Sequence, residues 1–337
     1  MLLAGDVGGT KTLLGLFDAA SDDTGARPRQ VFSRSYPTSK FASFTAILAA
    51  FARDAASVGQ GSLTIDAVAV GVAGPVVNGR ATVTHIGWDI SVAEIAAHLG
   101  TPRVRLLNDL EAMGMSVGAP GPAELEVLQA GVPDPDGNAA ILAAGTGLGA
   151  ALLHRTDGRL VPVPSEMGHT DFPARTDREL ELVRMMRASH GRAAVEHVLS
   201  GRGLVNLHQL THEGRGCPVV TDATAPDAPA LVSQAGLDRT CVSCVEALGM
   251  FVEAYGAGAG NLALLGVATG GVYVGGGIAP KILPALRDGR FMRAFLAKTP
   301  MDALVARIPV RVILNPDAGL LGAAVAAAEL IDANRSA

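Results

Sequence analysis

Two short segments rich in glycine and threonine carry the residue types that bind phosphate. They are Gly5-Asp6-Val7-Gly8-Gly9-Thr10 and Gly145-Thr146-Gly147-Leu148-Gly149. Apolar, β-prone stretches flank both segments, so we predict that each is the tight turn of a hairpin. Such turns expose backbone N–H groups, and glycine lets a phosphate group approach them closely. Two copies in one chain predict a nucleotide clamped between two lobes.

Asp6 stands at the end of an apolar strand, where a carboxylate is costly to bury without a partner. Beside a phosphate-binding turn, the natural partner is hydrated Mg²⁺. The alternative is an aspartate that only shapes the turn. We therefore predict Asp6 as the carboxylate associated with the metal.

Five further polar residues could do acid, base or hydrogen-bonding chemistry: Asn108, Asp109, Glu166, His169 and Glu196. Asn108 and Asp109 follow a predicted strand, and ligands of open α/β sheets bind at strand ends. The pair also suits the cap of a following helix, which is compatible with catalysis. Taken by itself, Glu196 has the pattern of an exposed helix carboxylate.

Three familiar patterns fail because their surroundings are wrong. Gly145-x-Gly147-x-x-Ala150 has the letters of a dinucleotide fingerprint, but a predicted strand follows it where that site needs a helix. No lysine follows a glycine, which excludes a Walker loop. Glu166-x-x-His169 has the spacing of half a carboxylate metal site on a helix, but its proline-rich surroundings predict a loop.

The composition bounds the class of protein. The chain has 337 residues, 49% of them hydrophobic, and its length predicts two lobes or domains. A net charge of −5 gives no electrostatic reason to expect nucleic acid or an anionic membrane. The first residues lack the basic start of a signal peptide, and the longest apolar stretch, 262–274, is too short to span a bilayer. We expect a soluble cytoplasmic protein with no nucleic-acid or membrane partner.

The chain has three cysteines, Cys217, Cys241 and Cys244. The Cys241-x-x-Cys244 pair could be half a zinc site or a redox pair. Helical periodicity places both on one apolar face, and the sequence shows no paired histidine nearby. We therefore favour buried, reduced thiols that pack as small hydrophobic side chains.

The elements that must position these residues are strands and helices read from apolar periodicity. Besides the strands of the first turn, the predicted strands are 31–36, 67–72, 104–107, 125–129, 139–144, 150–154, 272–274 and 310–314. The predicted helices are 41–57, 92–99, 109–115, 177–189, 193–199, 203–211, 237–268 and 318–330. Glycines 256, 258 and 260 weaken the helix 237–268. The strand-turn-strand unit recurs, which indicates two lobes of related architecture.

The pattern resembles the bacterial glucokinases of the hexokinase, Hsp70 and actin-like ATPase superfamily over nearly the whole chain. The two turns are similar to its phosphate motifs, and Gly275-Gly276-Gly277 is similar to its adenosine motif. Segments 107–112, 166–172 and 196–206 resemble its sugar-site signatures. The resemblance implies an α/β, two-lobed actin-like ATPase (ribonuclease H-like) fold with mixed β-sheets flanked by helices and a central cleft. We place the small domain at 1–115 plus 317–337 and the large one at 116–316.

The resemblance also implies ATP-dependent phosphorylation of D-glucose at the 6-hydroxyl, the first step of glycolysis. Asp109 would be the general base, and Mg²⁺ would lie near Asp6. The residues that would bind ATP are Asp6, Gly8, Gly9, Thr10, Lys11, Gly145, Thr146, Gly147, Gly276 and Gly277. Those that would hold the sugar are Asn108, Asp109, Glu166, His169 and Glu196. We also expect a homodimer.

Two residues depart from the family pattern: Lys11 stands where many glucokinases have asparagine, and Met167 replaces a frequent glycine. The chain also lacks the cysteine-rich zinc motif of the related ROK family, so the resemblance implies no zinc. One alternative function is a kinase for another hexose or an N-acetylhexosamine. The other is a ROK-type sugar-sensing regulator, which would need a DNA-binding domain before the first phosphate turn at Gly5.

Overall fold

The structure is a computed structural model that describes residues 1–21, 27–59, 64–83, 86–121 and 123–332. The chain divides into two compact units. Unit 1 comprises Met1–Pro122 and Asn315–Ala337, and unit 2 comprises Ala123–Leu314. Each unit has a sheet of its own. Within the described residues, no helix is long and apolar enough to cross a membrane.

Unit 1 is built on a five-stranded sheet in the order β3-β2-β1-β4-β8. Its strands are β1 (Leu2–Val7), β2 (Lys11–Ser21), β3 (Pro28–Pro37), β4 (Ala67–Val72) and β8 (Val104–Asn108). β1 and β2 pair antiparallel from Leu2↔Phe17 to Val7↔Thr12, which confirms the first predicted hairpin. β1, β4 and β8 run parallel. Because β4 is buried along its whole length, it reads as a continuous apolar run rather than an alternating one.

Both faces of this sheet carry packed side chains. Leu3 and Val7 of β1 belong to a cluster with helix α1, whereas Leu2 and Ala4 belong to a cluster with α3 and α11, as strand alternation requires. The helices are α1 (Phe44–Ser57), α2 (Val92–Leu99), α3 (Asp109–Ser116) and α11 (Ala318–Asp332), with the 3₁₀ turn η1 (Thr38–Lys40). A small sheet is made of β5 (Val76–Val77), β6 (Arg80–Thr82) and β7 (Asp89–Ser91).

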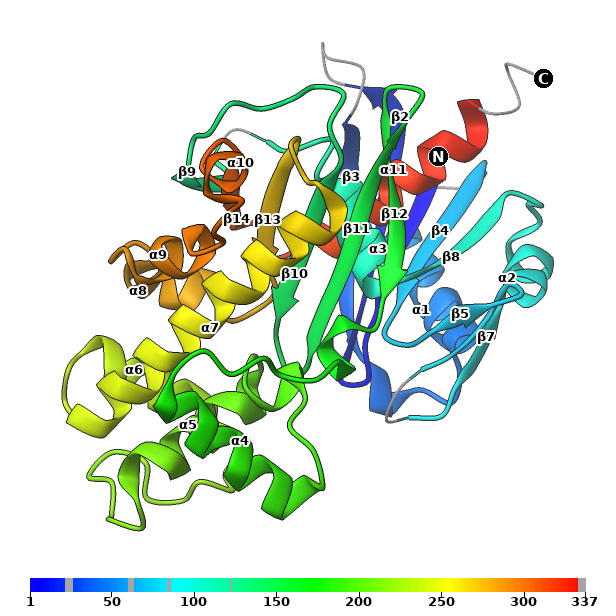
Figure 1. Cartoon of the computed structure of the whole chain (residues 1–337). Helices are drawn as coiled ribbons and strands as arrows, with labels where there is room; N and C mark the ends of the chain where they lie inside the picture. The colour runs from blue at the N-terminus through cyan, green and yellow to red at the C-terminus, as the bar shows by residue number, and fades with distance from the viewer. Residues whose placement is uncertain (22–26, 60–63, 84–85, 122, 333–337) are drawn as a thin grey trace. The chain divides into compact units, whose positions relative to one another are not determined.

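Unit 2 is built on a six-stranded sheet in the order β12-β11-β10-β13-β14-β9 (Figure 1). Its strands are β9 (Leu125–Gln129), β10 (Ala139–Ala144), β11 (Leu148–Thr156), β12 (Arg159–Ser165), β13 (Gly271–Gly275) and β14 (Val310–Ile313). β10 and β11 pair antiparallel from Ala139↔Leu153 to Ala144↔Leu148, which confirms the second predicted hairpin. β10, β13 and β14 run parallel.

The helices of unit 2 gather around one long helix, α7, which lies against β10, β11 and β13 (Figure 1). They are α4 (Asp177–His190), α5 (Gly201–His212), α6 (Ala228–Leu237), α7 (Val242–Gly266), α8 (Leu283–Leu286), α9 (Arg290–Leu296) and α10 (Asp302–Val305). The 3₁₀ turns are η2 (Met167–His169), η3 (Val195–His197) and η4 (Ala279–Ile282). A Cβ at Gly256 would lie 2.1 Å from the carbonyl oxygen of Phe291. The glycines of α7 therefore let α9 pack closely rather than weakening the helix.

The two large sheets share one connection pattern. In each, three antiparallel strands (β1 to β3, or β10 to β12) continue into two strands parallel to the first (β4 and β8, or β13 and β14). Each first hairpin contains one of the glycine turns. The recurrence that the sequence indicated is therefore a repeat of the whole sheet topology, with β9 added to unit 2.

One predicted helix is wrong, and the predicted helix 237–268 is confirmed as α7 (Val242–Gly266) with a later start. Segment 193–199 forms only η3, because Val195 N–H donates to the carbonyl oxygen of Thr170 and holds the segment in an extended course. Segment 237–268 is interrupted after α6, where Arg239 has a φ of +57°. Strand β12 was not predicted, because Pro162 and Pro164 lower its strand propensity. It is an edge strand, where proline is tolerated.

Candidate active site

In unit 1 the first glycine turn joins β1 to β2, and η1 supports it through hydrogen bonds. Gly8 N–H donates to the carbonyl oxygen of Lys11 at 2.9 Å and closes the turn. The hydroxyl of Thr38 donates to the carbonyl oxygen of Gly8 at 2.8 Å and lies 2.9 Å from the hydroxyl of Thr12. Thr10 and Lys11 are exposed. The turn is thus fixed by its carbonyls, and its tip faces outward.

Strand register brings the acidic residues of unit 1 to one edge of the sheet. Val7 pairs with Val72, and Val72 pairs with Asn108, so the carboxyl ends of β1, β4 and β8 coincide. Asp6 and Asp109 therefore lie at the edge where ligands of parallel sheets bind. Gly71 of β4 lets α3 pack close to this edge, since a Cβ on Gly71 would lie 2.8 Å from the Cβ of Ala112 in α3.

Asp6 is held beside the start of α11. A Cβ on Gly319 would lie 3.1 Å from Oδ2 of Asp6. Burial raises the pKa of Asp6, and the charge of Asp317 raises this pKa further while Lys11 lowers it. The carboxylates of Asp6 and Asp317 repel each other when both are ionised, and together they offer the oxygen ligands that Mg²⁺ prefers. The sequence reasoning missed Asp317, whose signal was its place just before an apolar helix.

Asn108 and Asp109 form the start of α3. Asn108 Oδ1 accepts from Leu110 N–H at 2.9 Å, and Asn108 N–H donates to Oε2 of Glu111 at 2.7 Å, which completes a capping box. The amide of Asn108 also donates to the carbonyl oxygen of Gly74 at 3.3 Å. The predicted cap is therefore confirmed, and it fixes the backbone on which Asp109 stands.

The carboxyl group of Asp109 has a pKa suited to proton transfer near neutral pH. Burial raises this pKa from 3.8 to about 6, and the charge of Asp6 adds to the increase. A hydrogen bond from Leu110 N–H to Asp109 Oδ1, at 2.9 Å, opposes the increase. Asp109 is thus an oriented carboxylate that holds a proton more strongly than a solvent-exposed aspartate does.

In unit 2 the second glycine turn joins β10 to β11. Gly145 N–H donates to the carbonyl oxygen of Gly147, and Gly201 N–H donates to that of Gly145, both at 2.8 Å. Gly276 has a φ of +83°, and a Cβ there would lie 2.3 Å from the carbonyl oxygen of Ala144. By contrast, a Cβ on Gly145 or Gly277 would meet no other atom of the described residues of unit 2 within 4 Å. These two glycines therefore border open space.

Glu196 lies directly against this turn. Its Oε2 accepts from Leu148 N–H at 3.0 Å, and a Cβ on Gly147 would lie 2.6 Å from the same oxygen. Gly168 also packs against Leu148, since a Cβ there would lie 2.4 Å from the Leu148 carbonyl oxygen. Leu148 therefore joins the segment of Glu196 to that of Glu166 and His169.

Glu166 precedes η2, His169 is its last residue, and both side chains are exposed. His169 Nε2 lies 3.8 Å from Glu166 Oε2. Arg192 donates to the carbonyl oxygen of His169 at 2.8 Å and to Oδ1 of Asp171 at 2.7 Å, which ties η2 to the segment before η3. η2 is a single turn rather than an α-helix. Unit 2 thus gathers Glu166, His169 and Glu196 around one strand end.

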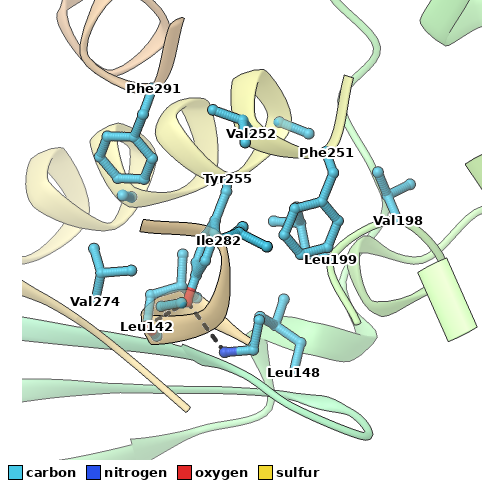
Figure 2. Close-up of a cluster of buried hydrophobic side chains, with 14 of the residues drawn as sticks. Leu142, Leu148, Val198, Leu199, Phe251, Val252, Tyr255, Val274, Ile282 and Phe291 are labelled. Atoms are coloured by element: carbon cyan, nitrogen blue, oxygen red, sulfur yellow. Dashed lines mark hydrogen bonds between the residues drawn. The ribbon is translucent and has the colours of Figure 1, made fainter. Parts of the chain in front are cut away.

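Tyr255 is a positioning residue that sequence reasoning missed. Figure 2 shows its ring reaching from α7 toward the strands among apolar neighbours. Its hydroxyl accepts from Ala144 N–H at 3.2 Å and lies 3.0 Å from the carbonyl oxygen of Gly275. Ala144 directly precedes the glycine turn at 145–147, and Gly275 is the first residue of the glycine run at 275–277. A single hydroxyl therefore fixes the ends of β10 and β13.

The sequence model of the family described as Glucokinase matches residues 3–330. The chain belongs to the glucokinase family. The glucokinase of Synechocystis sp. is 38% identical over 346 residues, covering 97% of this chain and 98% of that protein.

Solved structures of glucokinases share this fold. The crystal structure of glucokinase from an Antarctic psychrotroph has a TM-score of 0.84 at 28% identity, covering 97% of this chain and 98% of that one. A ROK family glucokinase from Streptomyces griseus, in complex with glucose and AMPPNP, has a TM-score of 0.62 at 22% identity and covers 97% of this chain and 99% of that one. The predicted actin-like ATPase fold and the predicted family are confirmed, and the chain is an enzyme.

Proposed function

We propose that the chain transfers the γ-phosphoryl group of ATP to the 6-hydroxyl of D-glucose, with Asp109 as the general base. The observation that carries this proposal is the glucokinase family match over residues 3–330. The half-buried carboxyl of Asp109, which stands on a capped helix start at the sheet edge, supports the assignment of the base.

The oxygen of the sugar 6-hydroxyl attacks the γ-phosphorus of ATP, and Asp109 accepts the proton of that hydroxyl. The bond between the γ-phosphorus and the β,γ-bridging oxygen breaks. The products are glucose 6-phosphate and ADP. Phosphoryl transfer has a loose transition state, so a well-placed weak base suffices. The raised pKa of Asp109, about 6, keeps this group ionised at neutral pH while making it a better proton acceptor than an ordinary aspartate.

The phosphate contacts are assigned to the two turns. In unit 1 they are Gly8, Gly9, Thr10 and Lys11, and in unit 2 they are Gly145, Thr146 and Gly147. The adenosine contacts are assigned to Gly276 and Gly277. The open space beside Gly145 and Gly277 supports this assignment, because a bare backbone there leaves room for a ligand. Mg²⁺ would neutralise phosphate charge, with Asp6 and Asp317 holding it directly or through water.

The sugar contacts are assigned to Asn108 and Asp109 in unit 1 and to Glu166, His169 and Glu196 in unit 2. Glu196 uses Oε2 for Leu148 N–H, which leaves Oε1 for a sugar hydroxyl. Groups of this kind reject a sugar that lacks the matching hydroxyl, because their own polar atoms would stay unpaired. The exposure of Glu166 and His169 is what a ligand-facing pair requires.

The test of the base is Asp109→Ala. We expect kcat to fall about 10³-fold or more while the dissociation constant for glucose changes less than about threefold. A coupled-enzyme assay measures kcat, and isothermal titration calorimetry measures the dissociation constant for glucose. Asp89→Asn, an exposed aspartate of the same unit, is the matched control and keeps full activity. Near-normal turnover in Asp109→Ala overturns the assignment.

A sugar panel addresses the substrate. With ATP, glucose should give the highest kcat/KM, ahead of other hexoses and N-acetylhexosamines.

We also propose that the enzyme acts as a cytoplasmic homodimer at the start of glycolysis. Its three cysteines are free, which fits a reducing compartment. Sedimentation equilibrium should give twice the mass of one chain, and a monomer at micromolar concentration contradicts the dimer.

A further inference from the structure

Five side chains of unit 2 converge at a place that the kinase chemistry does not use. They are His208, His212, Cys217, Cys241 and Cys244, called the Cys/His cluster below. His208 and His212 lie one turn apart at the end of α5, Cys217 lies in the following loop, and Cys241 and Cys244 lie at the start of α7. The prediction that no histidine accompanies the cysteine pair is therefore wrong.

The spacing of the donor atoms is that of a tetrahedral metal site. One ligand atom from each of His208, His212, Cys217 and Cys244 lies within 4.8 Å of the others. Cys217 Sγ is 3.8 Å from Cys244 Sγ and 3.9 Å from Cys241 Sγ. Tetrahedral Zn²⁺ with Zn–S bonds of about 2.3 Å places two sulfurs about 3.8 Å apart. A disulfide would need sulfurs at about 2.05 Å.

The second contacts of these side chains also suit a metal. His212 Nδ1 lies 2.8 Å from the carbonyl oxygen of His208, to which it donates, so Nε2 keeps its lone pair. Nε2 lies 3.3 Å from Cys241 Sγ. Val220 N–H donates to Cys217 Sγ at 3.3 Å, a contact that stabilises a thiolate. The backbone therefore orients one histidine and one cysteine for ligation.

His208 provides an independent sign of a missing partner. Its side chain is 6% exposed, and neither ring nitrogen has a hydrogen-bond partner among the residues that the structure describes. Its ring lies 3.9 Å from that of His212, centre to centre. A buried polar group without a partner is costly, and a ligand at this place would remove the cost.

We propose that the Cys/His cluster binds one structural Zn²⁺ through His212, Cys217 and Cys244, with the fourth position taken by Cys241 or His208. Each ligating cysteine loses its thiol proton to solvent when the ion binds, and no electrons are transferred. The set has no exposed open position of the kind that catalytic zinc keeps, since four of the five side chains are buried.

The ion would join segments that are distant in sequence. It would hold the end of α5 and its loop to the start of α7, across the interruption at 238–241 that separates α7 from α6. The other end of α5 begins at Gly201, whose N–H supports the second glycine turn. The site would thus stabilise the helical part of unit 2 without touching substrate.

Zinc content is the first measurement. The full chain is expressed with zinc in the medium, purified under argon with a reductant and without chelator, and assayed by mass spectrometry for metals. We expect about one zinc per chain in the wild type and a loss of at least about fivefold in Cys217→Ser and Cys244→Ser. His154→Ala, an exposed histidine of the same unit, is the matched control and keeps its zinc.

Reconstitution covers variants that fold poorly. Wild-type protein stripped of metal is titrated with Co²⁺ alone, and thiolate-to-cobalt charge-transfer absorption should saturate at one equivalent. Removing zinc should lower Tm by roughly 5 to 10 °C, and zinc should restore it. Cys241→Ser and His208→Phe, tested separately, show which supplies the fourth ligand, because only one of them should lose zinc affinity.

Two results overturn the proposal. One is a wild-type chain that neither contains zinc nor gives the cobalt absorption after reduction. The other is thiol counting that finds a disulfide among the three cysteines in freshly isolated protein. Neither measurement depends on kinase activity, so failure of the zinc site and failure of the proposed reaction are distinguished.

Discussion

Asp109 stands on a capped helix start, and its carboxyl is half-buried near the charge of Asp6. The pKa of about 6 predicts a pH profile. Glucose kcat/KM should rise with pH and level off above pH 7, with an apparent pKa near 6, because only the ionised carboxylate accepts the proton. Initial rates from pH 5 to 8.5 measure it, and a profile flat to pH 5 contradicts the assignment.

The same raised pKa makes a stability prediction for Asp109→Asn. The folded-state pKa of about 6 exceeds the ordinary aspartate pKa of 3.8, so the folded state favours the protonated carboxyl. The contribution of Asp109 to the free energy of unfolding is fully present below pH 3.8 and is lost as the pH rises through 6. Asp109→Asn should therefore be more stable than wild type by roughly 1 to 3 kcal/mol at pH 8 and equal to it near pH 4. Urea unfolding at both pH values checks this, and an equal difference at both is inconsistent with it.

Gly145 and Gly147, two residues apart, should affect different substrates. Gly147→Ala places a Cβ on the carboxylate of Glu196 and displaces it from Leu148 N–H, so KM for glucose should rise about 10- to 100-fold. Gly145→Ala places its Cβ in open space assigned to phosphate, so KM for ATP should rise instead. Each variant is the control of the other. Parallel increases in both constants would mean that the turn had simply collapsed.

At the scale of elements, the sequence predicted the strands and helices whose sequence patterns lie within one short segment. Both glycine hairpins, the buried strand 67–72 and the helix that begins at Asp109 are confirmed. What it missed depends on contacts between distant segments. η3 is not an α-helix because Thr170 binds its backbone, and the histidines of α5 reach the cysteines of α7 only through helix packing. No spacing rule within either segment shows such a meeting.

The same reasoning explains the unpredicted role of Tyr255, because its partners lie on two strands. Tyr255→Phe leaves Ala144 N–H without its acceptor inside the core, so the free energy of unfolding should fall by about 1 to 3 kcal/mol. Guanidinium unfolding measures the change. Tyr273→Phe is the control, since the Tyr273 hydroxyl makes no hydrogen bond to the described residues. Equal losses in both variants would remove the special role of Tyr255.

At the scale of the molecule, the candidate site residues are distributed over two sheets of one topology. Unit 1 carries the first glycine turn with Asp6 and Asp109, and unit 2 carries the second glycine turn with Glu196. The chain joins the units only at 122/123 and 314/315. Each unit also has its own packed clusters, which are the basis for separate unfolding.

Substrates should therefore couple the unfolding of the two units. Without ligand, calorimetry should give a calorimetric enthalpy larger than the van't Hoff enthalpy, because each unit unfolds on its own. At about 100 times its dissociation constant, glucose or a non-hydrolysable ATP analogue stabilises the native state by about 2.7 kcal/mol. If the bound pair uses residues from both units, the transitions should merge and the two enthalpies should converge. Glucose analogues that lack a required hydroxyl are the control. Two separate transitions that persist at saturation would mean that the ligands bind one unit only.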